Sequence, residues 1–285
     1  MTGVSEYEEP TLFDPGPEAQ PEILTKTSDR PVWSESKAEL IAQYLKYFVY
    51  VTKHGTYIDA FAGPQTDRSE HAWTAKLVLE SEPRWLRNFH LFDQSQDQVR
   101  HLKRLASTHR TRNIRIHHGN SNRVIPSVLP VGSIGEREAT FCLLDQRTFE
   151  CEWQLCEYIS RLRPGPVKVE QFYFLANSWM QRALTAVGTT DTEAQVKAWL
   201  GCEDWRVFAK LRSLQRQEYF VDKFRYELGY RSVRAWPIYG QEAGKGVLMY
   251  YMIHATDHEE APKLMSRAYR SAVTSADPVE QLELL

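Results

Sequence analysis

Polar side chains follow four of the predicted strands, at the point where each strand ends. They are Asp59, Asp93, Asn120 and Asp145. A buried strand has no use for an unpaired acid, because an uncompensated carboxylate costs several kcal/mol in an apolar interior. The carboxyl ends of parallel strands meet at one edge of a sheet, where ligands bind in open α/β folds. We therefore expect these side chains to lie together and to face a ligand.

Each residue type suits one part of a nucleoside-bearing cofactor. The turn at Gly63, within TYIDAFAGPQ (56–65), lets a ligand approach the backbone closely. Asp59 can hold a ligand ammonium, Asp93 can accept two hydrogen bonds from a ribose diol, and Asn120 offers a donor and an acceptor to an adenine edge. S-adenosylmethionine (SAM) fits better than NAD or a P-loop nucleotide, because neither GxGxxG nor GxxxxGK[ST] occurs.

The same residues have ordinary structural interpretations, which stay open. Asp59 can stabilise a turn or cap a helix, Asp93 can cap the helix that follows it, and Asn120 can be a plain loop residue. The order of these residues along the chain, rather than any one of them, indicates the cofactor site.

The elements that position these residues alternate between strands and helices. Apolar runs predict seven strands, with helical periodicity between most of them. The strands are expected at 57–61, 88–92, 114–117, 140–144, 169–175, 233–238 and 247–253. Such alternation predicts an α/β fold with a mostly parallel sheet covered on both faces. The last two strands are joined by a short turn (240–246), so that pair should be antiparallel.

Three segments flank or interrupt this sheet within a domain expected at 31–285. Residues 1–30 carry six acids before the first base, and four prolines, which predicts an acidic, flexible tail. A helix capped by Ser34 or Ser36 is expected next, with apolar residues at helical spacing as far as Val49. Residues at about 176–230 exceed what a crossover needs and are expected to form a helical insertion.

Composition indicates an ordinary globular protein. The net charge of −2 excludes a chain that is a polycation as a whole. No apolar stretch reaches about 18 residues and no charged-then-apolar leader is visible, so we expect no membrane span, no secretory signal and a cytoplasmic location. Four cysteines without CxxC spacing are expected to be reduced thiols. No metal site is expected, since His254 and His258 straddle a strand end instead of sharing a helix face.

Two local stretches are nevertheless strongly basic. Residues 97–115 carry six bases against one acid, and residues 205–234 carry eight against three, with aromatic side chains between them. The second stretch, which includes Arg212 and Arg216, has the pattern of a surface for an anionic strand, so RNA or DNA is an expected partner. Charged faces of amphipathic helices are the ordinary alternative.

Five segments together resemble one known family. They are SESKAELIAQYLKYFVYV (34–51), YIDAFAGPQ (57–65), LLDQRTFECEW (143–153), FYFLANSWM (172–180) and YYMIHATDHEEAPKLM (250–265). From about Trp33 to Ala272 the chain resembles the three-Cys-motif partner proteins (TcmP). The resemblance implies a Rossmann-like class I methyltransferase fold, SAM as cofactor, and a separate partner protein that carries the cysteine motif.

The resemblance also implies roles for individual residues. Asp59, Phe61 and Gly63 occupy the first cofactor motif. The ribose position falls on Asp93 and the adenine side on Asn120. Lys37 lies in the helix before the first strand, where the family tends to carry a lysine; we expect it at the pocket rim, contacting substrate, with a solvated helix lysine as the alternative.

The stretch after the fourth strand departs from a known methyltransferase motif. Base-amino methyltransferases carry [DN]PP[YF], which holds the exocyclic amine while an aromatic ring stacks on the base. DQRTFE lacks both prolines, so amino methylation of adenine or cytosine is not implied. Asp145 is expected to orient an acceptor, and Gln146 and Arg147 to bind it, with Asp145, Gln146 and Phe149 as the catalytic candidates. Phe149 or Trp153 is expected to stack on it, with core packing as the alternative for both rings.

Three functions therefore remain open from the sequence. The chain is a SAM-dependent methyltransferase of nucleic acid, a methyltransferase of another substrate, or a catalytically silent methyltransferase-like binding module that works with a partner protein.

Overall fold

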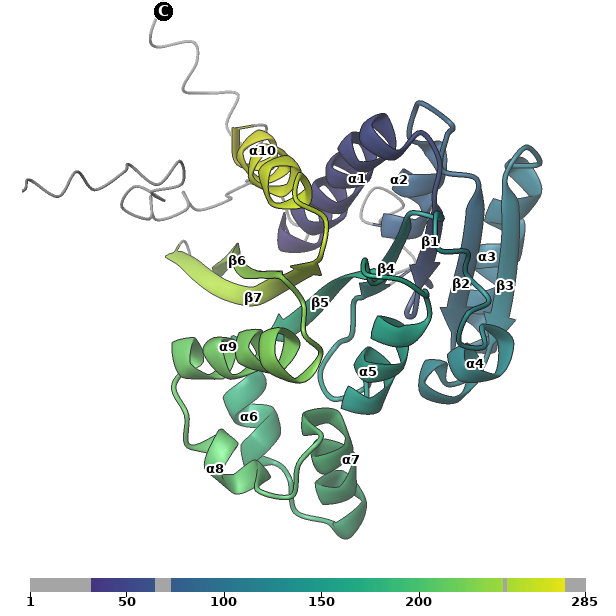
Figure 1. Cartoon of the computed structure of the whole chain (residues 1–285). Helices are drawn as coiled ribbons and strands as arrows, with labels where there is room; N and C mark the ends of the chain where they lie inside the picture. The colour runs from purple at the N-terminus through teal and green to yellow at the C-terminus, as the bar shows by residue number, and fades with distance from the viewer. Residues whose placement is uncertain (1–31, 65–72, 243–244, 275–285) are drawn as a thin grey trace, which may run out of the picture.

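Seven strands form one mixed sheet in a computed structural model of the chain, which describes residues 32–64, 73–242 and 245–274. The strand order is β3-β2-β1-β4-β5-β7-β6 (Figure 1). The strands are β1 (Thr56–Asp59), β2 (Asn88–Asp93), β3 (Asn113–His118), β4 (Thr140–Leu144), β5 (Glu170–Ala176), β6 (Ser232–Glu242) and β7 (Lys245–Thr256). The predicted acidic tail lies outside the described residues.

Strand directions confirm the predicted fold class. The pairs β1·β2, β2·β3, β1·β4 and β4·β5 are parallel, whereas β7 runs antiparallel to both β5 and β6. The sequence predicted a turn at 240–246, but the strands extend into it: β6 ends at Glu242 and β7 begins at Lys245. So short a connection requires an antiparallel pair, because a parallel pair would need a long crossover. The chain thus has a Rossmann-like α/β sheet, mostly parallel with an antiparallel last pair.

Helices cover both faces of this sheet (Figure 1). The first face packs against four helices: α1 (Val32–Thr52), α2 (Thr74–Glu80), α3 (Gln96–Thr108) and α10 (Ala261–Thr274). On the opposite face lie α4 (Ser121–Val128) and α5 (Trp153–Arg161). Alternate residues of β5 show this division, since Phe172 contacts Tyr44 of α1 while Tyr173 contacts Phe220 and Phe224 on the other side.

Helix α1 is fixed to the first face by apolar packing and by two polar contacts. Its apolar positions from Leu40 to Val49 are buried, as their helical spacing predicts. Near the amino edge of the sheet, Tyr44 donates a hydrogen bond to Glu170, which His254 also contacts (Nε2 to Oε1, 2.9 Å). Two turns earlier, Lys37 reaches Asp145 at the carboxyl edge. The helix begins at Val32, so the predicted caps at Ser34 and Ser36 are wrong: both residues lie inside it.

Between β5 and β6 the chain forms five short helical segments. They are α6 (Met180–Thr185), α7 (Thr190–Leu200), α8 (Trp205–Ala209), α9 (Ser213–Asp222) and the π-helical turn η2 (Lys223–Glu227). An aromatic cluster holds this insertion together, with Trp199 against Phe208 and Phe220. Trp153 of α5 contacts Phe220 and Phe224, so the insertion rests on α5.

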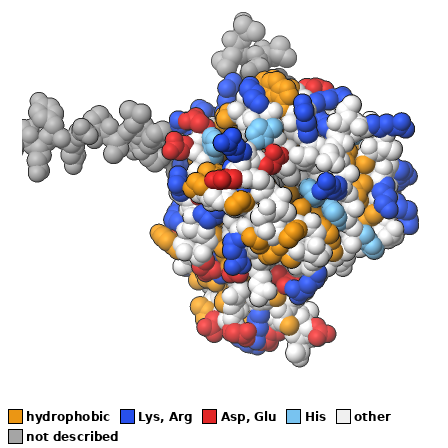
Figure 2. Space-filling view, turned by 45° about the vertical axis from the view of Figure 1, so that its right-hand side comes forward, with side chains coloured by type: hydrophobic (Ala, Val, Ile, Leu, Met, Phe, Trp, Pro, Cys, Tyr) orange, Lys and Arg blue, Asp and Glu red, His pale blue; other side chains and the backbone are white. Residues whose placement is uncertain are grey.

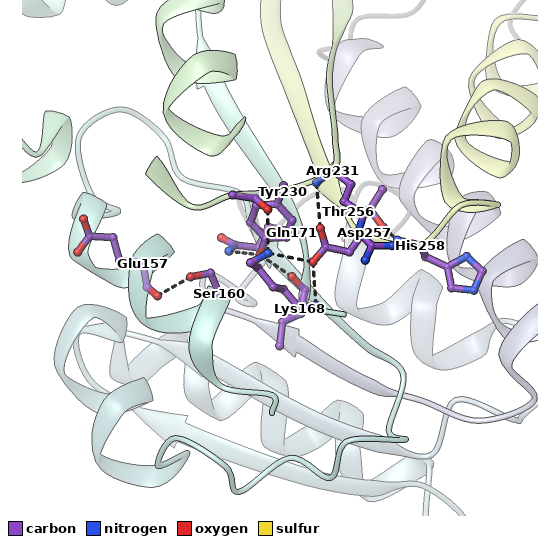
Figure 3. Close-up of polar contacts among 11 residues, drawn as sticks. Glu157, Ser160, Lys168, Gln171, Tyr230, Arg231, Thr256, Asp257 and His258 are labelled. Atoms are coloured by element: carbon purple, nitrogen blue, oxygen red, sulfur yellow. Dashed lines mark hydrogen bonds and ion pairs between the residues drawn. The ribbon is translucent and has the colours of Figure 1, made fainter. Parts of the chain in front are cut away.

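A polar cluster fixes the exit of the insertion to the sheet (Figure 3). Buried Asp257, just after β7, accepts hydrogen bonds from the backbone amides of Lys168 (3.0 Å) and Arg231 (2.9 Å). The Tyr230 hydroxyl donates to the Val169 carbonyl at 2.6 Å and accepts from Gln171 at 2.7 Å. The chain therefore leaves the insertion at a fixed point beside the start of β5.

Within the described ranges, no helix combines the length and the apolar character that a membrane crossing needs.

Candidate active site

A small acidic pocket opens at the carboxyl ends of β1 and β4. Its cavity volume is about 10 Å³, and its walls come from Asp59, Phe61, Ala62, Gly63, Trp73, Thr74, Ala75, Leu143 and Asp145. The Trp73 indole donates a hydrogen bond to the Ala62 carbonyl at 2.6 Å and so forms one wall. Three of the sequence-predicted residues of the first motif (Asp59, Phe61 and Gly63) therefore share a pocket with Asp145.

Asp59 is buried at the end of β1 with its carboxylate engaged. The Tyr57 hydroxyl donates to Oδ2 (2.8 Å) and the Phe61 amide donates to Oδ1 (3.1 Å). Burial raises the pKa of Asp59 to about 7, and the charges of Asp145 and Asp93 add to this rise, against the lowering effect of its two hydrogen bonds. Asp59 thus stabilises the turn after β1, as one of its sequence interpretations predicted. Its carboxyl group also lines the pocket and has a pKa of about 7.

Gly63 and Asp93 join the ends of β1 and β2. The Gly63 amide donates to Asp93 Oδ2 at 3.0 Å, and the Ser95 amide donates to Oδ1 at 2.8 Å. A Cβ at residue 63 would overlap the Asp93 carboxylate and the Gln98 side chain, so only glycine permits this approach. The cap of α3 is Ser95 rather than Asp93. A carboxylate has about four lone-pair sites, so the two amides leave Asp93 acceptor capacity for a diol.

Asn120 is exposed and caps α4, accepting a hydrogen bond from the Asn122 amide at 2.9 Å. The sequence did not single out Asn122, which is the more deeply engaged residue. Its side chain donates to the Glu150 carbonyl (2.8 Å) and accepts from the Glu152 amide (3.0 Å). It thereby holds the loop that follows β4. The only sequence signal was its place in the polar run GNSN beside Asn120.

Asp145 forms a buried ion pair with Lys37. Lys37 Nζ lies 2.6 Å from Asp145 Oδ1. The same ammonium lies over the rings of Phe174 (4.7 Å) and Tyr250 (4.8 Å), which supply cation–π contacts. Lys37 was expected at the pocket rim, but its side chain is 2% exposed. The structure therefore places it behind Asp145, where it cannot be a solvated helix lysine.

The rest of the DQRTFE stretch is built into the fold. Gln146 is buried, donating to the Phe174 carbonyl (3.3 Å) and accepting from the Cys151 amide (3.0 Å), and these bonds explain its position without a catalytic role. Phe149 packs on Trp199 of the insertion with ring centroids 4.9 Å apart. Arg147 is exposed, and its backbone amide donates to Glu150 Oε2 at 2.7 Å.

The basic stretch at 205–234 does not form the continuous face that the sequence suggested. Arg216 is buried, where it donates to Gln181 and to the Ala209 carbonyl, so the prediction that it contacts an anionic strand is wrong. Lys223 is likewise buried over Trp153. Arg212 is exposed. A sequence count of charges cannot tell which of them pack inside a helical cluster.

The histidine and cysteine side chains of the described residues do not assemble a metal site. His254 is committed to Glu170 in the interior. Within the described part of the chain, no group of three or more His, Cys, Asp or Glu side chains is arranged to hold a metal ion. The four cysteines are free thiols, three of them buried and Cys202 partly exposed.

Comparison with known proteins adds only a general likeness of fold. No family model and no curated protein matches this chain. Among solved structures, TYW2 of M. jannaschii in complex with AdoMet is 7% identical over 75% of this chain and 75% of that one, with a TM-score of 0.41. WT Trm5b from Pyrococcus abyssi is 10% identical over 75% of this chain and 48% of its own, with a TM-score of 0.39.

A third solved structure is the plantazolicin methyltransferase BamL in complex with a triazolic desmethylPZN analog and SAH. It is 12% identical over 86% of this chain and 77% of that chain, with a TM-score of 0.44. Such distant similarity does not bear on reaction or substrate. The resemblance to the three-Cys-motif partner proteins, and the partner that it implies, stay predictions.

Proposed function

We propose that the chain binds SAM at the carboxyl edge of the sheet and transfers its methyl group to an acceptor. The observation that supports this most is the convergence of acidic groups: Asp59 and Asp145 line one pocket, and Asp93 adjoins it through Gly63. SAM carries an ammonium and a sulfonium, so an acidic pocket suits it. A dinucleotide would bring a pyrophosphate, which these carboxylates would repel.

The described residues fit the cofactor by type and place. Asp59 would hold the ammonium, Asp93 the ribose hydroxyls and Asn120 the adenine side, while the Gly63 turn allows close approach of the backbone. Bound SAM supplies an electrophilic methyl group. The chain then aligns an acceptor beside Asp145 and excludes water.

A catalytically silent binding module is the second candidate. One observation favours it: Asp145, the residue assigned to the acceptor, is held in a buried ion pair with Lys37. A carboxylate engaged in this way serves stability as readily as catalysis.

Calorimetric titration with SAM and with its demethylated product tests the binding step. Asp93→Ala should weaken binding by about 1.5–3 kcal/mol, the scale of hydrogen bonds to a charged group. Asp97→Ala, which changes an exposed acid on α3, is the matched control and should bind like the wild type. Unchanged affinity in Asp93→Ala would show that the ribose is held elsewhere.

Asp145→Asn separates the two candidates. In an enzyme it should leave cofactor affinity within about tenfold, or about 1.4 kcal/mol, while methyl transfer falls about a hundredfold, as expected when a positioning or proton-accepting group is lost. Because Asp145→Asn also leaves buried Lys37 unpaired, a loss of folding stability is expected for both candidates. Loss of cofactor binding in parallel with methyl transfer would instead support the binding module.

A further inference from the structure

The outer strand of the sheet is less covered than the other parallel strands. β3 lies at the edge of the sheet with α3 behind it (Figure 1). Its residues alternate between exposed and half-buried, whereas β1 and β4 are buried throughout. Parallel sheets are normally covered on both faces.

The helix that follows β3 on its second face, α4, is short and is bonded to α5. Helix α4 has eight residues, with Pro126 inside it. The Tyr158 hydroxyl of α5 donates to the carbonyls of Pro126 (3.3 Å) and Leu129 (3.0 Å), which draws α4 toward α5. Arg115, on this face of β3, is exposed as a result.

Three flat rings stand in a stack beside Arg115. His117 lies parallel to Phe92, with centroids 4.4 Å apart and planes at 17°, and to His90, at 5.6 Å and 2°. Phe92 and His90 are buried, so half-buried His117 is the ring of this stack that reaches the surface. Burial lowers the pKa of both histidines, that of His90 to about 4. The imidazoles are therefore neutral at pH 7, and the charge of this face comes from arginine and lysine.

The charge around the ring stack has one sign. Residues 96–118 contain six Lys and Arg side chains, of which Arg112 is buried against backbone carbonyls, and a single acid, Asp97, which pairs with Arg100. Lys103, Arg110 and Arg115 are exposed, and the described residues provide no acidic partner for them. Figure 2 shows Lys, Arg and His side chains gathered on the flank that corresponds to the right-hand side of Figure 1. Helix α3 covers the first face of β3 and the ring stack lies on the second, so these cations flank the outer strand on both sides. We call this outer margin of the sheet, formed by α3 and β3, the edge surface.

We propose that the edge surface binds single-stranded RNA and that this RNA is the methyl acceptor. Exposed cations attract the phosphates. A half-buried ring beside an exposed arginine suits an unpaired base, which RNA-binding proteins stack on aromatic, histidine and guanidinium planes. The surface also leads to the pocket: β3 ends at His118, and the next residue, Gly119, donates to the Asp93 carbonyl at 3.0 Å. The inference deepens the proposed function and relies on it only for the transfer step.

Fluorescence anisotropy with a labelled RNA of about 12 nucleotides, within the usual site sizes of single-strand binders, tests the proposal without cofactor. The double variant Lys103→Glu, Arg115→Glu should bind at least about tenfold more weakly, with the slope of log affinity against log salt reduced by about 1.4 for two lost phosphate contacts. The matched control is Lys210→Glu, Arg212→Glu, which reverses the same exposed charges on the insertion. It should stay within about twofold of the wild type.

His117 distinguishes stacking from simple charge. His117→Ala should weaken RNA binding by about fivefold or more, the lower end of base stacking, and leave the salt slope unchanged. His117→Phe keeps a flat ring and should restore affinity, which a purely structural role would not produce.

Four results would overturn the inference: no RNA binding by the wild type at low salt, equal losses in the two double variants, equal affinity for single-stranded DNA, or equal affinity for a duplex. SAM titration of the wild type separates this inference from the proposed function. SAM binding without RNA binding in the wild type refutes the edge surface alone, whereas absent SAM binding in the wild type refutes the cofactor site. The Lys103→Glu, Arg115→Glu protein should bind SAM like the wild type.

Discussion

Asp59→Asn should stabilise the cofactor-free protein, and should do so more at high pH. Asparagine is nearly the same size and can keep both contacts, accepting from the Phe61 amide and donating to the Tyr57 hydroxyl. What it removes is the cost of ionising a buried carboxyl group. The pKa of Asp59 is raised by burial from 3.8 to about 7.

The sign follows from proton binding. A folded-state pKa above the unfolded value means that the native state holds the proton more tightly between about pH 4 and pH 7, so stability is lost as pH rises through this window. With the pKa values 3.8 and about 7, the cost is about 1.7 kcal/mol at pH 5 and about 4 kcal/mol at pH 8, using 1.36 kcal/mol per pKa unit. The variant should therefore gain about 2.5 kcal/mol on the wild type between these pH values.

Thermal and urea unfolding at pH 5 and pH 8 measure this difference directly. A gain of about 2.5 kcal/mol corresponds to about 5–10 °C in Tm for a domain of this size. Asp97→Asn, at an exposed position on α3, is the control and should show little pH-dependent difference. If Asp59→Asn shifts stability equally at both pH values, the carboxyl group titrates as in the unfolded chain, and the raised pKa is refuted.

Three further outcomes are expected. SAM affinity should fall about fivefold from pH 7 to pH 6, because protonation of Asp59 competes with its binding of the ligand ammonium. Calorimetry of Asp59→Asn should show no such fall. Lys37→Met should lower the free energy of unfolding by about 3–5 kcal/mol, because it leaves Asp145 buried and unpaired. In urea unfolding, the double variant Lys37→Met, Asp145→Leu should recover much of this lost stability. A double variant no more stable than the single one would refute the ion-pair account. Gly63→Ala should reduce SAM affinity at least about tenfold with a loss of about 1–3 kcal/mol in stability, because its Cβ overlaps Asp93; unchanged binding would show that the turn can shift freely.

The sheet could be predicted from the sequence because its signals are local. Apolar runs marked each strand, and the short connection 240–246 required an antiparallel pair. The same logic brought Asp59 and Asp145 to one pocket, since both follow neighbouring parallel strands. An acid at the end of a predicted strand can be recognised in the sequence, and in the structure Asp59 and Asp145 lie at those strand ends.

The roles that sequence reasoning missed depend on packing between distant segments. Lys37 and Asp145 are 108 residues apart, and nothing in either neighbourhood shows that α1 crosses the end of β4. Gln146 reads as a substrate ligand until its two backbone partners are known. Arg216 reads as a surface cation because burial of an arginine depends on carbonyls and amides supplied by other helices.

The two polar contacts of α1 also limit how this chain can change in length. Lys37 and Tyr44 are seven residues apart, which places them about 10.5 Å apart along one side of the helix, and their partners lie at opposite edges of the sheet. One residue inserted or deleted between them would turn the helix by about 100° and separate one of the two pairs. Genetic drift can thus replace residues on the outer side of α1, but the interval from 37 to 44 has a fixed number of residues in any descendant that keeps both contacts.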